Sequence, residues 1–128
     1  MIKDFFKTIF FSIIVFFILK TINSSTYIYH MYELTKNIPL IYILILAPIF
    51  EEYLFRGYIF SFLETKTKYA NILQALLFSL LHINPIQMAY TFILGYYLGN
   101  IQKKYGIYYC IFLHIVFNLF NFLISNIF

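Results

Sequence analysis

Two adjacent glutamates and an arginine interrupt an apolar stretch near the middle of the chain, APIFEEYLFRGYIFSFL at residues 47–63. Glu52 and Arg56 stand four residues apart, so on a helix they share one face and can form an ion pair. That pair alone would be a sufficient structural reason for both residues. Glu51 is turned by about 100° from Glu52 and cannot share that face. We therefore expect Glu51 to be the glutamate that is left for chemistry.

Other polar residues occur in apolar stretches further along the chain, His82 in one of them and His114 with Asn118 in the last. Counted at about 1.5 Å per residue from the expected inner ends of their helices, Glu51 and His82 lie roughly 18–20 Å deep. His114 and Asn118 lie at about 14 and about 20 Å by the same count. Carboxylates, imidazoles and an amide at one level can activate water, bind a metal or relay protons.

The elements that must position these groups are apolar helices. The chain has 128 residues, of which 62% are hydrophobic and 11% are charged, whereas a soluble domain is less apolar and more charged. We expect an all-α polytopic membrane helix bundle with about five transmembrane helices. The expected spans are 5–20, 38–63, 69–84, 86–102 and 105–127.

Two segments follow from these spans. Residues 1–37 would form an N-terminal transmembrane helix with an outer loop, and residues 38–128 would form the core. The first span is short, and its rival interpretation is a signal peptide. No small-x-small cleavage site follows it, so we favour a retained helix.

The lysines predict how the bundle is oriented. If the N-terminus lies inside, only Lys20 and Lys36 fall in the outer loop that follows the first span. The inner segments then carry Lys3, Lys7, Lys66, Lys68, Lys103 and Lys104. This excess predicts a multi-pass protein of the cell membrane with its C-terminus outside. Because the lysines are scattered between apolar runs, the net charge of +4 does not indicate a nucleic-acid partner.

Other features of the chain favour helix packing rather than chemistry. Gly95 and Gly99 have the small-xxx-small spacing that lets another helix approach closely. Cys110 is expected to be a buried, inert thiol, and His30 is expected to be solvated in the outer loop. One polar stripe of the last helix should face the bundle interior, and it consists of His114, Asn118, Asn121 and Ser125.

Three motifs in this chain resemble, in order and spacing, those of the CPBP intramembrane proteases. They are E-E-x-x-x-R at 51–56, F-x-x-x-H at 78–82 and H-x-x-x-N at 114–118. The family includes type II CAAX prenyl endopeptidases and bacterial bacteriocin-processing and immunity proteins, and it is also called the abortive-infection family. The similarity covers about residues 41–122.

The resemblance implies an intramembrane endopeptidase that hydrolyses a peptide bond of a membrane-associated peptide or protein. It assigns Glu51 and His82 to holding and deprotonating the attacking water, and His114 and Asn118 to stabilising the oxyanion of the tetrahedral intermediate. It implies that the ion pair between Glu52 and Arg56 orients these catalytic groups.

The cofactor is left open at this point. The family is commonly labelled a metalloprotease, and Glu51, His82 and His114 would suit a single catalytic divalent metal, with zinc the first choice. However, the chain contains no H-E-x-x-H, and water activated by a glutamate explains the same residues without any cofactor.

The biological substrate is also open, with a bacteriocin leader peptide, another membrane peptide or self-immunity as the alternatives. Membrane lipid is an expected partner. Many family members have more spans than this chain, so an oligomer or a partner subunit could complete the enzyme. Two rival functions remain. One is a non-catalytic membrane immunity or scaffolding protein that keeps the polar cluster for helix packing, and the other is a proton- or ion-handling membrane protein.

Overall fold

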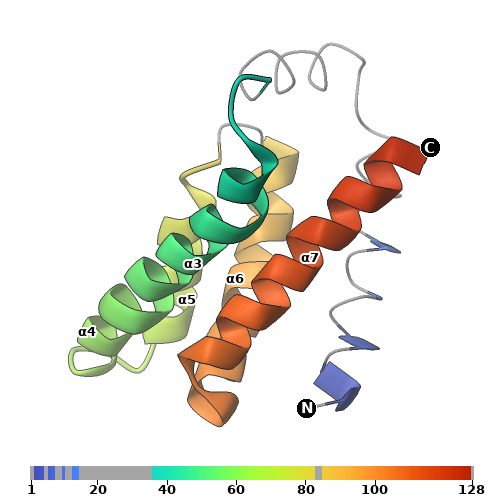
Figure 1. The fold of residues 1–128 in the computed structure, drawn as a ribbon. Coiled ribbons are helices and arrows are strands. Elements are labelled where there is room, and N and C mark those ends of the chain that lie inside the picture. The colour runs from blue at the N-terminus through green and yellow to red at the C-terminus, as the bar shows by residue number, and fades with distance from the viewer. Residues whose placement is uncertain are drawn as a thin grey trace. The chain divides into compact units, whose positions relative to one another are not determined.

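The computed structural model describes residues 2–4, 6, 7, 10, 13, 14, 36–82 and 85–127. All regular secondary structure among these residues is helical, which confirms the predicted fold class (Figure 1). The chain divides into two compact units. The central unit is Pro48–Phe112, and the terminal unit combines Met1–Ala47 with Leu113–Phe128. Most of the first expected span, and His30, lie outside the described residues.

From residue 42 onward, the first helical segment consists of four consecutive pieces: η1 (Tyr42–Leu46), α3 (Ala47–Glu52), η2 (Tyr53–Ile59) and α4 (Phe60–Glu64), where η denotes a π-helix. After a turn follow α5 (Ala70–Ser79), α6 (Pro85–Tyr105) and α7 (Ile107–Ile127). Four expected helices are thus present. The expected 69–84 helix is too long, because the chain turns after Ser79, where Leu81 N–H donates to the Phe78 carbonyl at 3.3 Å.

The π-helical turns in the first segment were not predicted. The Phe60 N–H donates to the carbonyl of Phe55, five residues earlier, instead of four as in an α-helix. Such wide turns are rare and often occur at functional sites. Here the change from α to π geometry falls directly after Glu52, within the first sequence motif.

Among the residues that the structure describes, no helix combines the length and the apolar character needed to cross a membrane. The element order confirms the helical fold class, but the structure does not show the expected transmembrane spans.

The core of the central unit lies where α5 packs along α6, with α4 and η2 on α5. Gly95 and Gly99 make this approach possible, as their spacing predicted. A methyl group at Gly95 would lie 3.1 Å from Cδ1 of Phe78, and one at Gly99 would overlap the Asn71 side chain. The apolar residues buried around this contact are Phe55, Phe60, Ala70, Ala75, Phe78, Leu94, Leu98 and Ile101.

A glycine ends α6 and allows α7 to begin. Gly106 has a φ of 84°, which a residue with a side chain rarely adopts, and its N–H donates to the Gln102 carbonyl at 2.9 Å. Just beyond this turn, Cys110 is buried, as expected, and its Sγ donates to the Leu98 carbonyl at 3.3 Å.

Candidate active site

The first motif forms a buried ion pair at the junction of α3 and η2. Arg56 Nη1 donates to Oε1 of Glu52 at 2.8 Å, and neither side chain is exposed to solvent. The spacing of four residues predicted this pairing. A charge pair in such surroundings is costly to desolvate, so geometry and further interactions must support it.

Glu51 lies on another face, as expected from its position next to Glu52. Its side chain is half-buried, whereas that of Glu52 is fully buried. The Glu51 carboxylate also interacts electrostatically with Arg56, more weakly than Glu52 does.

His82 lies just past the end of α5, in the turn rather than inside a long helix. Its Nδ1 is 3.3 Å from the carbonyl oxygen of Phe78. A carbonyl oxygen only accepts, so this hydrogen bond requires the proton on Nδ1. In the neutral imidazole Nε2 then carries the lone pair that can accept a proton or bind a metal. The carbonyl of Phe78 thus favours the tautomer that a base or ligand at Nε2 needs.

An aromatic ring connects the first motif with the second. The guanidinium carbon of Arg56 lies 4.3 Å from the centroid of the Phe78 ring. The same ring meets Phe55 edge-on at 5.2 Å and the imidazole of His82 at 5.4 Å between centroids. In the sequence, Phe78 was noted only as the first residue of the F-x-x-x-H motif, without a role. Its position four residues before His82 was the available signal for a contact between the two.

His114 and Asn118 lie on α7 in the terminal unit, four residues apart. His114 is buried and Asn118 is half-buried. The central unit brings together Glu51, Glu52 and Arg56 and, through Phe78, His82. The convergence of His114 and Asn118 with these residues stays a prediction. Ser125, at the end of the predicted polar stripe, has a side chain outside the described part of the chain.

A metal ion would be held by carboxylate and imidazole groups from three motifs. Within the described residues, no three or more His, Cys, Asp or Glu side chains gather closely enough to hold one. Inside the central unit, the groups that could bind a metal are the Glu51 carboxylate and Nε2 of His82. These two donor types fit zinc, but zinc sites in enzymes take three protein ligands. The metal therefore stays a prediction.

A cluster of uncharged polar groups joins α5 to α6, and sequence reasoning missed it. Gln74 Nε2 donates to the Gly95 carbonyl at 2.9 Å and to Asn71 Oδ1 at 2.8 Å. Asn71 Nδ2 donates to the Tyr96 carbonyl at 3.1 Å and to Asn100 Oδ1 at 3.0 Å. The three amides sit beside the predicted helix contact, and this proximity was the available signal.

A family model provides the link to known proteins. The model described as type II CAAX prenyl endopeptidase Rce1-like matches residues 33–120, more than half of the chain. The match includes all residues of the three motifs. Searches of curated proteins and of solved structures gave no match. With its motifs in the order and spacing set out above, this chain belongs to the Rce1-like family of type II CAAX prenyl endopeptidases.

Proposed function

We propose that the chain is an intramembrane endopeptidase that cleaves a membrane-associated peptide or protein with water activated by Glu51 and His82. The observation that carries the proposal is the half-buried Glu51 next to the fully buried pair of Glu52 and Arg56, in a chain of a peptidase family. A packing role alone would require the buried pair but not Glu51 and His82.

In the proposed reaction, Glu51 accepts a proton from water while the water oxygen attacks the scissile carbonyl carbon. His82, with its proton on Nδ1, accepts a hydrogen bond from the same water at Nε2. The carbonyl oxygen becomes an oxyanion, which His114 and Asn118 stabilise by donating hydrogen bonds. As the peptide bond breaks, the proton held by Glu51 moves to the leaving amine.

A metal would alter this scheme only in part. Bound by Glu51, His82 and His114, a zinc ion would lower the pKa of a coordinated water and polarise the carbonyl. The residues of the chain would keep their task of binding, orienting and moving the proton.

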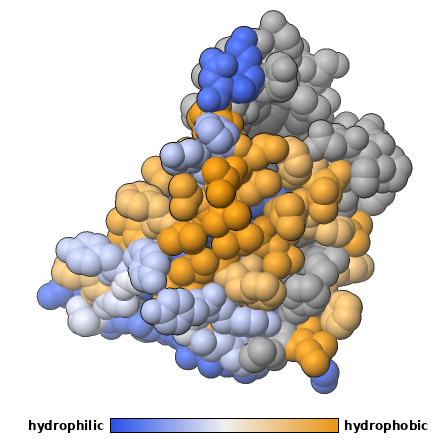
Figure 2. Space-filling view, in the orientation of Figure 1, coloured by the Kyte–Doolittle hydropathy of each residue, from blue (hydrophilic) through white to orange (hydrophobic). Residues whose placement is uncertain are grey.

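The surface of the central unit supports a membrane location. Large apolar side chains are exposed on this surface, among them Phe50 at 69% and Leu81 at 62% exposure. Figure 2 shows hydrophilic residues near the end of the central unit where α4 lies in Figure 1. An apolar surface of this kind is suited to lipid rather than water.

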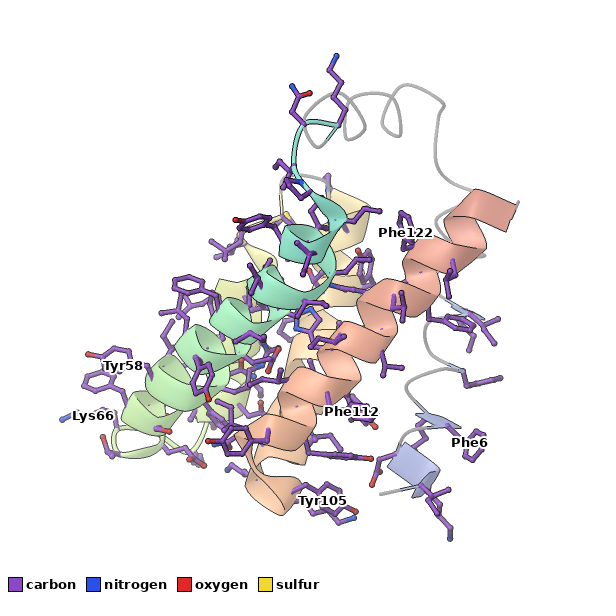
Figure 3. All side chains as sticks on the ribbon, in the orientation of Figure 1. Phe6, Tyr58, Lys66, Tyr105, Phe112 and Phe122 are labelled. Atoms are coloured by element: carbon purple, nitrogen blue, oxygen red, sulfur yellow. The ribbon has the colours of Figure 1, made fainter. Side chains whose placement is uncertain are left out.

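The hydrophilic end carries Lys103 in the last turn of α6 and Lys66 in the turn that follows α4. Lys103 Nζ contacts Oε1 of Glu64 at 2.7 Å and lies 5.1 Å from the Phe60 ring, which joins the end of α6 to α4. Lys66, labelled in Figure 3, projects from the turn after α4. Cytoplasmic loops of membrane proteins carry an excess of lysine, so we propose that this end faces the cytoplasm.

We propose a substrate class from the chemistry of the site and from the family. The half-buried carboxylate of Glu51, next to the exposed apolar side chain of Phe50, suits a peptide held at the membrane by a lipid group or by its own apolar sequence. A prenylated C-terminal peptide and an apolar leader peptide are the two classes to compare. The rival function, a non-catalytic immunity or scaffolding protein, is supported by the full burial of the Glu52–Arg56 pair.

The experiment compares wild type with Glu51→Gln in proteoliposomes, using a prenylated peptide and an unmodified apolar leader peptide as probes. Cleavage is followed by mass spectrometry, and chelator is added in a parallel arm. We expect Glu51→Gln to lower kcat at least about 100-fold, because the proton acceptor is lost. Glu64→Gln makes the same change at the exposed carboxylate and should leave cleavage unchanged. Equal cleavage by wild type and Glu51→Gln would contradict the proposal.

A further inference from the structure

We propose that Phe78 is a positioning residue for this reaction: its ring holds the Arg56 guanidinium against one face and packs against the His82 imidazole in a T-shaped contact. The ring thereby sets His82 relative to the helix turn that carries Glu51. This inference rests on the proposed function for its catalytic consequence, whereas the contacts that carry it lie entirely within the central unit.

The first step concerns Arg56, which has more hydrogen-bond donors than described partners. Its Nη1 donates to Glu52, but Nε and Nη2 are buried without a hydrogen-bond partner among the described residues. The Phe78 ring lies 4.3 Å from the guanidinium carbon instead. The negative face of an aromatic ring attracts a cation most strongly where water is excluded. An aliphatic side chain of similar size would not supply this attraction.

The second step concerns His82, which Phe78 holds in two ways. The backbone carbonyl of Phe78 lies 3.3 Å from Nδ1, and its ring meets the imidazole at 5.4 Å with an interplanar angle of 74°. The carbonyl selects the tautomer, and the ring limits the direction in which the imidazole points. The turn after Ser79 alone would leave the His82 side chain with its usual rotamers.

The third step concerns what holds the ring itself. Phe78 is buried, and a methyl group at Gly95 of α6 would lie 3.1 Å from its Cδ1. The backbone at Gly95 is in turn fixed by the hydrogen bond from Gln74 Nε2 to its carbonyl at 2.9 Å. The ring therefore has α6 against it and cannot shift in that direction without moving a helix. This support makes it a rigid link between the two motifs.

The test replaces Phe78 with phenylalanines that carry one, two or three ring fluorines. Fluorine weakens the negative face of the ring with little change in size, so it separates the cation interaction from packing. We expect kcat to fall stepwise, by about tenfold with three fluorines, while KM stays within twofold. The matched control is the same series at Phe60, which is equally buried and lies under Lys103 instead of Arg56.

A second readout does not depend on finding a substrate. In the protein with isotope-labelled histidine, Phe78→Leu should shift the imidazole resonances of His82, because the ring current of Phe78 is lost. Phe60→Leu should leave them in place. If Phe78→Leu fails to fold, the fluorinated series provides the same comparison.

The outcomes separate this inference from the proposed function. If Glu51→Gln abolishes cleavage while fluorination changes neither kcat nor the His82 resonances, the role of Phe78 is wrong and the endopeptidase stands. If Glu51→Gln retains cleavage but the His82 resonances follow the Phe78 ring, the proposed mechanism is wrong and the positioning contact stands. An equal fall in kcat in the Phe60 series would show a general packing effect and overturn the inference.

Discussion

Two ion pairs of the central unit have nearly the same length but very different surroundings. Glu52 and Arg56 meet at 2.8 Å with no exposure to solvent. Glu64 and Lys103 meet at 2.7 Å, with 37% and 52% of their side chains exposed. The first pair lies within one helical segment, while the second joins two helices at the lysine-rich end. In both pairs the cation also lies over an aromatic ring.

The difference shows that the length of an ion pair alone does not determine its contribution to stability. Exposed pairs are screened by water and contribute little to stability. A buried pair costs desolvation when it forms, and it costs even more when one partner is removed, because the other charge stays behind. We therefore infer that the pair of Glu52 and Arg56 is kept for the position of its neighbours, and that the pair of Glu64 and Lys103 is a surface contact.

The largest effect is expected from Arg56→Met. This change removes the cation and leaves the Glu52 carboxylate buried, which should lower the free energy of unfolding by about 3–5 kcal/mol. The interaction with the Phe78 ring is lost as well. The measurement is unfolding in detergent by denaturant, followed by circular dichroism.

The double variant Glu52→Leu/Arg56→Met sharpens this prediction. Without either charge the desolvation cost disappears, so the double variant should regain most of the stability that Arg56→Met loses. Peptide cleavage should remain absent in it, because Glu51 and His82 lose their orientation. A double variant less stable than Arg56→Met would contradict this view of the pair.

An intermediate effect is expected from Gly99→Ala, which acts on the uncharged polar cluster between α5 and α6. The added methyl group overlaps Asn71 and approaches Gln74 Nε2, so the hydrogen bonds between the helices must rearrange. Overpacking of this kind should cost about 1–3 kcal/mol in the free energy of unfolding. Gly57→Ala is the matched control, since the nearest atom to its methyl group is the flexible end of Ile107 at 3.2 Å and its other neighbours lie at ordinary contact distance. Equal losses in both variants would argue against a specific role for the cluster.

The smallest effect is expected from Lys103→Met at the exposed pair. The free energy of unfolding should change by at most about 1 kcal/mol, and the change should shrink further as salt is added. The comparison with Arg56→Met uses the same new side chain at a buried and an exposed cation. A loss at Lys103 as large as that at Arg56 would remove the distinction between the two pairs.

Several of these features could be predicted from the sequence because they are local. The spacing of Glu52 and Arg56 specified their pairing, and Gly95 with Gly99 specified a close helix contact. The three motifs identified the family. The π turns, the end of α5 at Ser79 and the amide cluster around Gln74 were missed, since each depends on which helix lies alongside.

Within one helix, a fixed rise and turn decide which side chains are neighbours, so the sequence by itself determined the helical class, the ion pair and the separate face of Glu51. Only the tertiary structure decided that the Phe78 ring contacts both Arg56 and His82. That contact requires α5 to lie against both η2 and α6, with Gly95 at the point of closest approach. The reason is physical: packing between helices depends on the shapes of whole faces, which no local pattern specifies.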